Sequence, residues 1–147
     1  DQETSIVHGD FRLDNMIFDP ITHEVKAILD WELSTLGNPI ADFTYHMMSW
    51  RLPAGAKGLG MMGSDLKSLN IPSESEYAEL YYKKTGREKI DNWDFYMAYN
   101  IFRLAGIAQG IVGRVRDGTA SSSEAKNYEA FVPILGKLGW SIVEGIK

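Results

Sequence analysis

The chain has 147 residues, of which 44% are apolar and 24% charged, and its 15 basic and 20 acidic side chains give a net charge of −5. This length and composition suit a single globular domain and exclude wholesale disorder. The acidic balance and the lack of a dense Lys/Arg run argue against nucleic-acid binding, and the absence of cysteine excludes disulfides and thiolate metal sites.

The sequence also argues against a membrane-embedded or exported protein. Its longest uncharged run, residues 104–113, is far shorter than the ~20 apolar residues that a membrane span needs. Residues 1–4 are polar and acidic, unlike a signal peptide. We therefore expect a cytoplasmic protein with no membrane or nucleic-acid partner.

Three short apolar runs in the first third of the chain predict β-strands over residues 5–7, 16–18 and 25–29. The turn-forming pair Asp19-Pro20 lies between the second and third runs, so these two runs predict a hairpin. The first run leads directly into the sequence HGD.

A helical pattern begins at Pro39, which suits a first helical turn. Apolar residues then recur at helical spacing, at Ile40, Phe43, Met47 and Trp50. The Gly-rich residues 52–64 predict a mobile loop, either a lid or a plain connection.

A capping box and a stop signal bound the next helix. Ser73 and Glu76 form the box, and Gly86 provides the stop, so we expect a helix over residues 74–85. Its acidic side chains, Glu74, Glu76 and Glu79, predict a solvated face.

Two more helices complete the pattern. Asp91 can cap a helix that runs to about Arg116 and that we expect to be buried, because it is apolar nearly all round. A second capping box, Ser121 with Glu124, predicts a final helix interrupted by Pro133. A small β section followed by several helices predicts an α+β fold, mostly helical.

The residues that carry chemistry lie in HGDFRLDN (residues 8–15) and ILDWE (residues 28–32). Asn15 precedes the first hairpin strand and Asp30 follows the second, so the hairpin should return both to the same side, near Asp10. Carboxylate and amide oxygens are ligands that Mg²⁺ prefers, and Arg12 adds a fixed positive charge. Such a set is what phosphoryl transfer requires.

At these residues, and at LDWELSTLGNPIADF (residues 29–43) and residues 92–118, the sequence resembles the aminoglycoside phosphotransferase / choline kinase-like family of the protein-kinase-like fold. Within it, the chain looks like the kinase-like modules of acyl-CoA dehydrogenase family members 10 and 11 and their bacterial relatives. The resemblance covers essentially the whole chain, as the C-terminal lobe of such an enzyme.

The resemblance implies an ATP- and Mg²⁺-dependent kinase. Asp10 matches the catalytic Asp, and Asn15 and Asp30 match the groups that hold metal and nucleotide. Arg12 matches a position that meets the transferred phosphoryl group. The sequence departs from the family pattern after Asp30, where Trp-Glu replaces Phe-Gly.

Further roles follow from the resemblance or from single residues. His8 and Asp42 match groups that support the catalytic loop. A substrate-facing role is open for Trp31, Glu32 and Arg103, against plain packing or ion pairing. Of the remaining histidines, His23 is expected to be solvated and His46 to pack in the core.

Residues 1–147 contain no Gly-rich loop and strand lysine of an N-terminal nucleotide-binding lobe. We therefore expect the chain to be part of a larger protein, to bind ATP poorly alone, and to act on a hydroxylated small molecule such as a hydroxy-acyl metabolite. The resemblance also implies an association with an acyl-CoA dehydrogenase. Two alternatives stay open: a non-catalytic kinase-like module that binds acyl-CoA or a partner domain, and a metal-dependent hydrolase using His8, Asp10 and Asp30.

Overall fold

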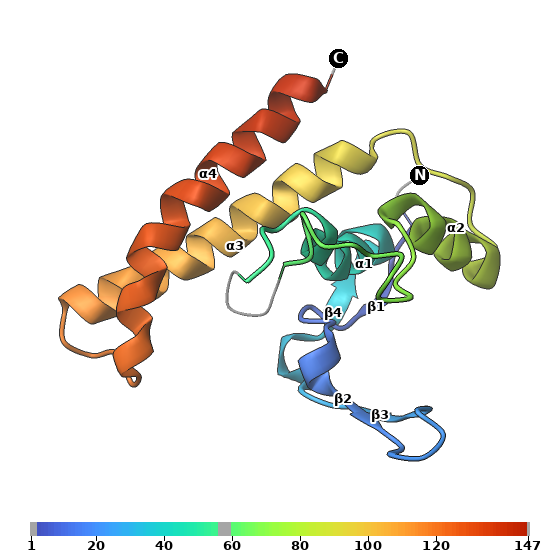
Figure 1. The fold of residues 1–147 in the computed structure, drawn as a ribbon, viewed down its shortest axis with the longest axis horizontal. Helices are drawn as coiled ribbons and strands as arrows, with labels where there is room; N and C mark the ends of the chain where they lie inside the picture. Colours follow the sequence, from blue (N-terminus) through green and yellow to red (C-terminus); the bar gives the residue numbers. More distant parts are fainter. Residues whose placement is uncertain (1–2, 56–59, 147) are drawn as a thin grey trace. The chain divides into compact units, whose positions relative to one another are not determined.

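The computed structural model describes residues 3–55 and 60–146 of a chain that forms two compact units, Asp1–His46 and Met47–Lys147 (Figure 1). The first unit holds the described strands, and the second is helical. The predicted α+β class is confirmed. No helix within the described residues is both long and apolar enough to cross a membrane.

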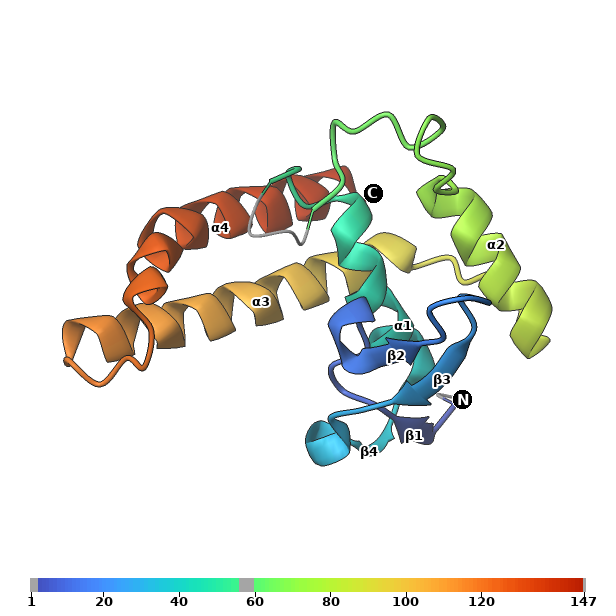
Figure 2. The ribbon, with the colours of Figure 1, turned by 60° about the horizontal axis from the view of Figure 1, so that its bottom comes forward.

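The first unit contains two small antiparallel sheets (Figure 2). β2 (Met16–Phe18) and β3 (Val25–Ile28) make the predicted hairpin, with β3 one residue shorter than expected. β1 (Ser5–Val7) pairs with β4 (Thr35–Gly37), a strand that the sequence reading missed. β4 has only three residues and no clear alternation of polar and apolar side chains, so its sequence pattern is too weak to predict a strand. Its partner β1 is also distant in the chain.

The hairpin turn is shaped by Asp19. Its Oδ1 atom accepts hydrogen bonds from the backbone N–H groups of Ile21 and Thr22, both at 2.9 Å. These amides, Thr22 first, lower the pKa of the Asp19 carboxyl because they favour its charged form. The turn therefore fixes the register of the two strands that carry Asn15 and Asp30 at their ends.

α1 (Pro39–Met47) begins at the predicted residue. Asn38 caps it, because its Oδ1 atom accepts from the N–H groups of Ile40 at 2.8 Å and Ala41 at 3.3 Å. A 3₁₀ turn over Met48–Trp50 follows, and Met47 and Met48 are buried, as gap-filling residues should be.

α2 (Glu74–Thr85) matches the prediction at both ends. The Ser73–Glu76 capping box is formed, and Gly86 takes the left-handed conformation, with φ +69°, that ends the helix. The loop predicted over residues 52–64 is closed by a hydrogen bond between its described parts, in which the Met62 N–H donates to the Leu52 carbonyl at 2.9 Å. The predicted mobile loop includes residues 56–59, which lie outside the described residues.

α3 (Trp93–Arg116) and α4 (Tyr128–Gly145) lie side by side (Figure 1). Only one stripe of α3 is buried, with Met97, Ile101 and Leu104, while Phe95, Tyr99 and Phe102 are exposed. The expectation of a helix buried nearly all round was therefore wrong.

Three predictions about helix ends were also wrong. The residue that precedes α3 is Asn92, not Asp91, and its side chain makes no capping hydrogen bond. A 3₁₀ segment, Ser123–Asn127, comes before α4, so the Ser121 box does not open that helix. α4 continues through Pro133, because its packing along α3 outweighs the local cost of the proline.

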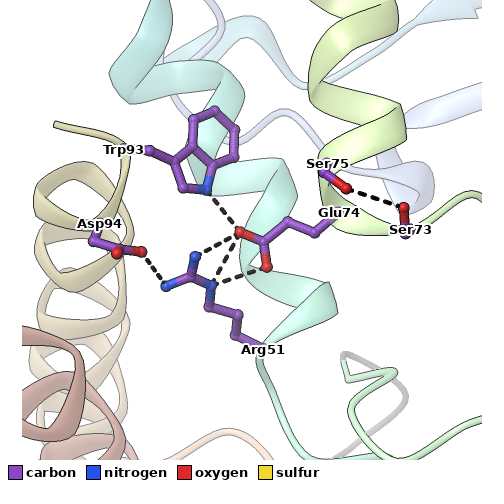
Figure 3. Close-up of polar contacts among 6 residues, drawn as sticks. All are labelled: Arg51, Ser73, Glu74, Ser75, Trp93 and Asp94. Carbon is purple, nitrogen blue, oxygen red and sulfur yellow. Dashed lines mark hydrogen bonds and ion pairs between the residues drawn. The ribbon is translucent and has the colours of Figure 1, made fainter. Parts of the chain in front are cut away.

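A polar cluster around Arg51 joins three segments of the second unit (Figure 3). The Arg51 guanidinium binds Glu74 through two nitrogens, at 2.9 and 2.7 Å, and donates from its third to Asp94 at 2.6 Å. Trp93 Nε1 also donates to Glu74 at 2.7 Å. Glu74 is therefore half-buried and paired, which corrects the prediction that it lies on a solvated face.

Candidate functional site

Asp42 of α1 holds the start of the loop that runs from His8 to Asn15. The two carboxylate oxygens of Asp42 accept hydrogen bonds from the backbone N–H groups of His8 and Gly9, both at 2.8 Å. Gly9 has φ +84°, and a Cβ there would lie 2.6 Å from the Leu33 carbonyl oxygen, so only glycine fits. The glycine in HGD indicates this tight turn in the sequence. Nothing in the sequence indicates that Leu33 lies against it.

His8 is almost fully buried, at 3% exposure, and both of its ring nitrogens are used. Nδ1 accepts from the Asp10 N–H at 3.2 Å, and Nε2 lies 2.8 Å from the Leu29 carbonyl, to which it donates. This pairing fits a neutral imidazole with its proton on Nε2. The Trp31 ring covers it, with ring centroids 4.7 Å apart. A metal-binding His8, which the hydrolase alternative needs, has no support in this geometry.

Asp10 and Asn15 are in direct contact. Asn15 Nδ2 donates to Asp10 Oδ2 at 3.2 Å and to the Asp10 carbonyl at 2.9 Å. Because the amide nitrogen faces Asp10, the amide oxygen of Asn15 faces away from it. Neither this oxygen nor Asp10 Oδ1 accepts a hydrogen bond from the described residues. Two oxygens that could bind a ligand are thus left over.

Asp30 ends the hairpin on the same side. The Leu29 N–H donates to the Asn15 carbonyl at 2.8 Å, which ties the residue before Asp30 to the loop. Asp30 itself has φ +64° and is exposed, and its carboxylate has no hydrogen bond or ion pair within the described residues, including none to Asp10 or Asn15. A left-handed non-glycine residue costs on the order of 1 kcal/mol, and such strain is typical of functional sites.

Arg12 adds the positive charge of the loop. Its Nε lies 3.7 Å from Asp10 Oδ2, and its Nη2 lies 3.0 Å from the exposed Asp14. The buried Nε has no hydrogen-bond partner within the described residues. Across residues 3–55 and 60–146, no three His, Cys, Asp or Glu side chains gather so as to hold a metal ion.

The remaining predicted residues have different positions. Glu32 is exposed in the 3₁₀ turn Trp31–Leu33, and the half-exposed Trp31 donates from Nε1 to the Ile28 carbonyl at 2.8 Å. Arg103 lies half-buried on α3, in the second unit. His46 is half-buried beside the Phe11 ring, and burial lowers its pKa.

Known proteins resemble this chain over nearly its whole length. Residues 1–80 match the model of the phosphotransferase enzyme family. The chain is 46% identical over 140 residues to mouse acyl-CoA dehydrogenase family member 10, and 37% identical over 140 residues to human acyl-CoA dehydrogenase family member 11. Each match covers 95% of this chain but only 13% and 18% of the relative, so the chain spans less than a fifth of these proteins.

A solved structure agrees with these matches. It comes from Ralstonia eutropha and is named as an aminoglycoside phosphotransferase; it is 49% identical to this chain and superimposes with a TM-score of 0.92. The match covers 98% of this chain and 44% of the solved chain. With a family model that matches more than half of its residues, the chain belongs to the phosphotransferase enzyme family.

Proposed function

We propose that this chain is the C-terminal lobe of a kinase that transfers the γ-phosphoryl group of ATP, with Mg²⁺, to a hydroxyl group of a small molecule. One observation carries the proposal. In a member of the phosphotransferase family, Asn15 holds Asp10 at 3.2 Å, while the Asn15 amide oxygen and the Asp30 carboxylate stay unpaired within the described residues.

Asp10 is the proposed catalytic residue. Its Oδ2 atom is occupied by Asn15, and Oδ1 is left to accept the proton of the acceptor hydroxyl or to orient that hydroxyl. The turn that carries it is fixed by Asp42 and His8, so the carboxylate is positioned before substrate binds. His8 and Asp42 are thus proposed as positioning residues.

Asn15 and Asp30 would hold Mg²⁺ and, through it, the nucleotide phosphates. Their free oxygens are hard ligands, which fits this ion. Two protein ligands suffice, because Mg²⁺ usually keeps waters and binds substrate phosphates as well. When bound there, Mg²⁺ would supply neutralisation of the phosphate charge.

Arg12 is proposed to stabilise charge on the transferred phosphoryl group. Its guanidinium lies beside Asp10 and is about two-fifths exposed, so it can exchange the solvated Asp14 for a phosphate oxygen at little cost. Trp31, Glu32 and Arg103 are candidates for contacts to the acceptor.

The remaining nucleotide contacts would come from a further lobe. The chain corresponds to 44% of the solved relative, which leaves ample length for one. We expect residues 1–147 alone to bind Mg-ATP weakly, which calorimetry can measure. The names of the curated relatives support an association with an acyl-CoA dehydrogenase. A hydroxy-acyl metabolite is the acceptor that we propose.

The substitution Asp10→Asn in the complete protein tests the proposal. We expect turnover of ATP with an acceptor found by metabolite screening to fall at least about a hundredfold, or ~2.7 kcal/mol. Asp14→Asn is the matched control, because Asp14 lies on the same loop but is 65% exposed, and it should change turnover by less than about threefold. A loss below about tenfold for Asp10→Asn would rule out its proposed role.

A further inference from the structure

A separate cavity of about 300 Å³ lies at the turn between α3 and α4. Its polar lining comes from Arg114 near the end of α3, Ser121 and Ser122 in the turn, and Tyr128 at the start of α4. Ile111 and Ala125 add apolar walls. No described Asp or Glu lines it, so the cavity presents hydroxyl groups and one positive charge.

Backbone hydrogen bonds bring the serines back over the end of α3. The Arg114 carbonyl accepts from the N–H groups of Thr119 at 2.9 Å and Ala120 at 3.1 Å. Gly118 has φ +71°, the left-handed conformation that lets the chain reverse there. The residues immediately after Ala120 are therefore held beside Arg114.

The charge of Arg114 is uncompensated within the described residues. Arg51 pairs with Glu74 and Asp94, and Arg116 lies 3.4 Å from Asp117, but the guanidinium group of Arg114 has no ion pair or hydrogen bond there. Its side chain runs back along α3, where Nη1 would lie 3.9 Å from a Cβ on Gly110. A charge that only offset the helix dipole would not need to line a cavity together with hydroxyl-bearing residues.

We propose that this cavity binds the phosphate or carboxylate head group of a small metabolite. A guanidinium group offers paired N–H donors that match both oxyanions, and the exposed Ser121 hydroxyl can donate a further hydrogen bond. The volume lies at the lower end of the range for small-molecule sites. Ile111 and Ala125 would contact a short apolar group attached to the anion.

Calorimetric titration of the complete protein with inorganic phosphate, acetate and butyl phosphate at constant ionic strength tests this site. We expect millimolar binding of an oxyanion and tighter binding of butyl phosphate than of phosphate. Arg114→Gln should weaken binding at least about tenfold, whereas the matched Arg116→Gln, with an arginine 83% exposed, should weaken it less than about twofold.

Each outcome of these titrations either supports or overturns the proposed site. A preference for phosphate over acetate, or the reverse, supports the site and identifies its head group. Equal weakening by Arg114→Gln and Arg116→Gln, or no binding of any probe, overturns it. Loss of binding through Arg12→Gln but not through Arg114→Gln also overturns it, because the anion would then occupy the phosphotransfer loop. Ser121→Ala, at an exposed position, repeats the test should Arg114→Gln fail to fold.

Discussion

Two polar clusters in this chain each combine an arginine with acidic side chains, but they differ in how many of their polar atoms are paired. Around Arg51, a guanidinium binds two carboxylates and an indole N–H completes the set, with contacts of 2.6 to 3.1 Å (Figure 3). Around Asp10, hydrogen bonds fix the backbone of the loop and join one face of the Asp10 side chain to Asn15. The Asn15 amide oxygen and the Asp30 carboxylate receive nothing from the described residues.

The difference distinguishes polar groups that stabilise the fold from polar groups that are available to a ligand. Burial alone would lower the pKa of Arg51, but its hydrogen bonds to Glu74 and Asp94 raise it overall, so the ion pair is retained inside the fold. That cluster has no capacity for a ligand. The cluster around Asp10 has unpaired oxygens on a fixed backbone, and Asp30 in it has a strained left-handed conformation. Both features are expected of a preorganised site.

Among the substitutions that test this contrast, Asp30→Asn in the complete protein should have the largest effect. Asparagine tolerates the left-handed conformation, so the backbone should stay in place while the metal site loses a charge. We expect turnover to fall about a hundredfold, ~2.7 kcal/mol, with a higher Mg²⁺ concentration for half-maximal rate. Titration of the rate with Mg²⁺ measures both.

The matched control is Glu24→Gln, which removes an exposed carboxylate from the same hairpin. It should leave the Mg²⁺ dependence unchanged. An Asp30→Asn protein with the Mg²⁺ dependence of the unsubstituted protein would place Asp30 outside the metal site and end the contrast between the two clusters.

A smaller effect, on stability, is expected for Arg51→Met. Removal of the guanidinium leaves two carboxylates without their cation, which for a buried pair costs about 3–5 kcal/mol. Because Arg51 and Glu74 keep about a quarter of their side chains exposed, solvent reduces this to ~2 kcal/mol. Hydrogen exchange at the first turns of α2 and α3 should then speed up about thirtyfold.

Arg116→Met serves as the comparison, since Arg116 is 83% exposed and should alter exchange little. The Mg²⁺ dependence of the reaction should be the same in both variants. Unchanged exchange in Arg51→Met would mean that the cluster does not hold α2 and α3 at their starts.

The sequence was informative where local chemistry decides the structure. The Ser73–Glu76 box, the Gly86 stop and the β2–β3 hairpin depend on neighbouring residues, and all were predicted. The prediction that Asp91 caps α3 was wrong, because the helix begins two residues later and exact helix ends are weakly specified by sequence. β4 was missed because its partner β1 is distant in the chain.

The same distinction holds for the sites. The spacing of Asp10, Asn15 and Asp30 was visible because one hairpin joins them. The pairing of Arg51 with Glu74 was not, since it joins residues 23 positions apart and carries no periodic signal. The contact of the His8 ring with the Leu29 carbonyl was also hidden, because a backbone acceptor has no side-chain signature.

The smallest effect should come from His46, which lies beside Phe11 in the first unit. Burial lowers its pKa below 6.5, so the unfolded state takes up a proton first as the pH falls. Its contribution to stability is therefore complete above about pH 6.5 and decreases as the pH falls from there towards the folded-state pKa.

Melting temperatures measured at pH 7.5 and pH 5.5 test this expectation. The two temperatures should differ less in His46→Phe than in the unsubstituted protein. His23→Gln, at an exposed turn, is the control. An equal pH dependence in all three proteins would show that His46 titrates alike in the folded and unfolded states.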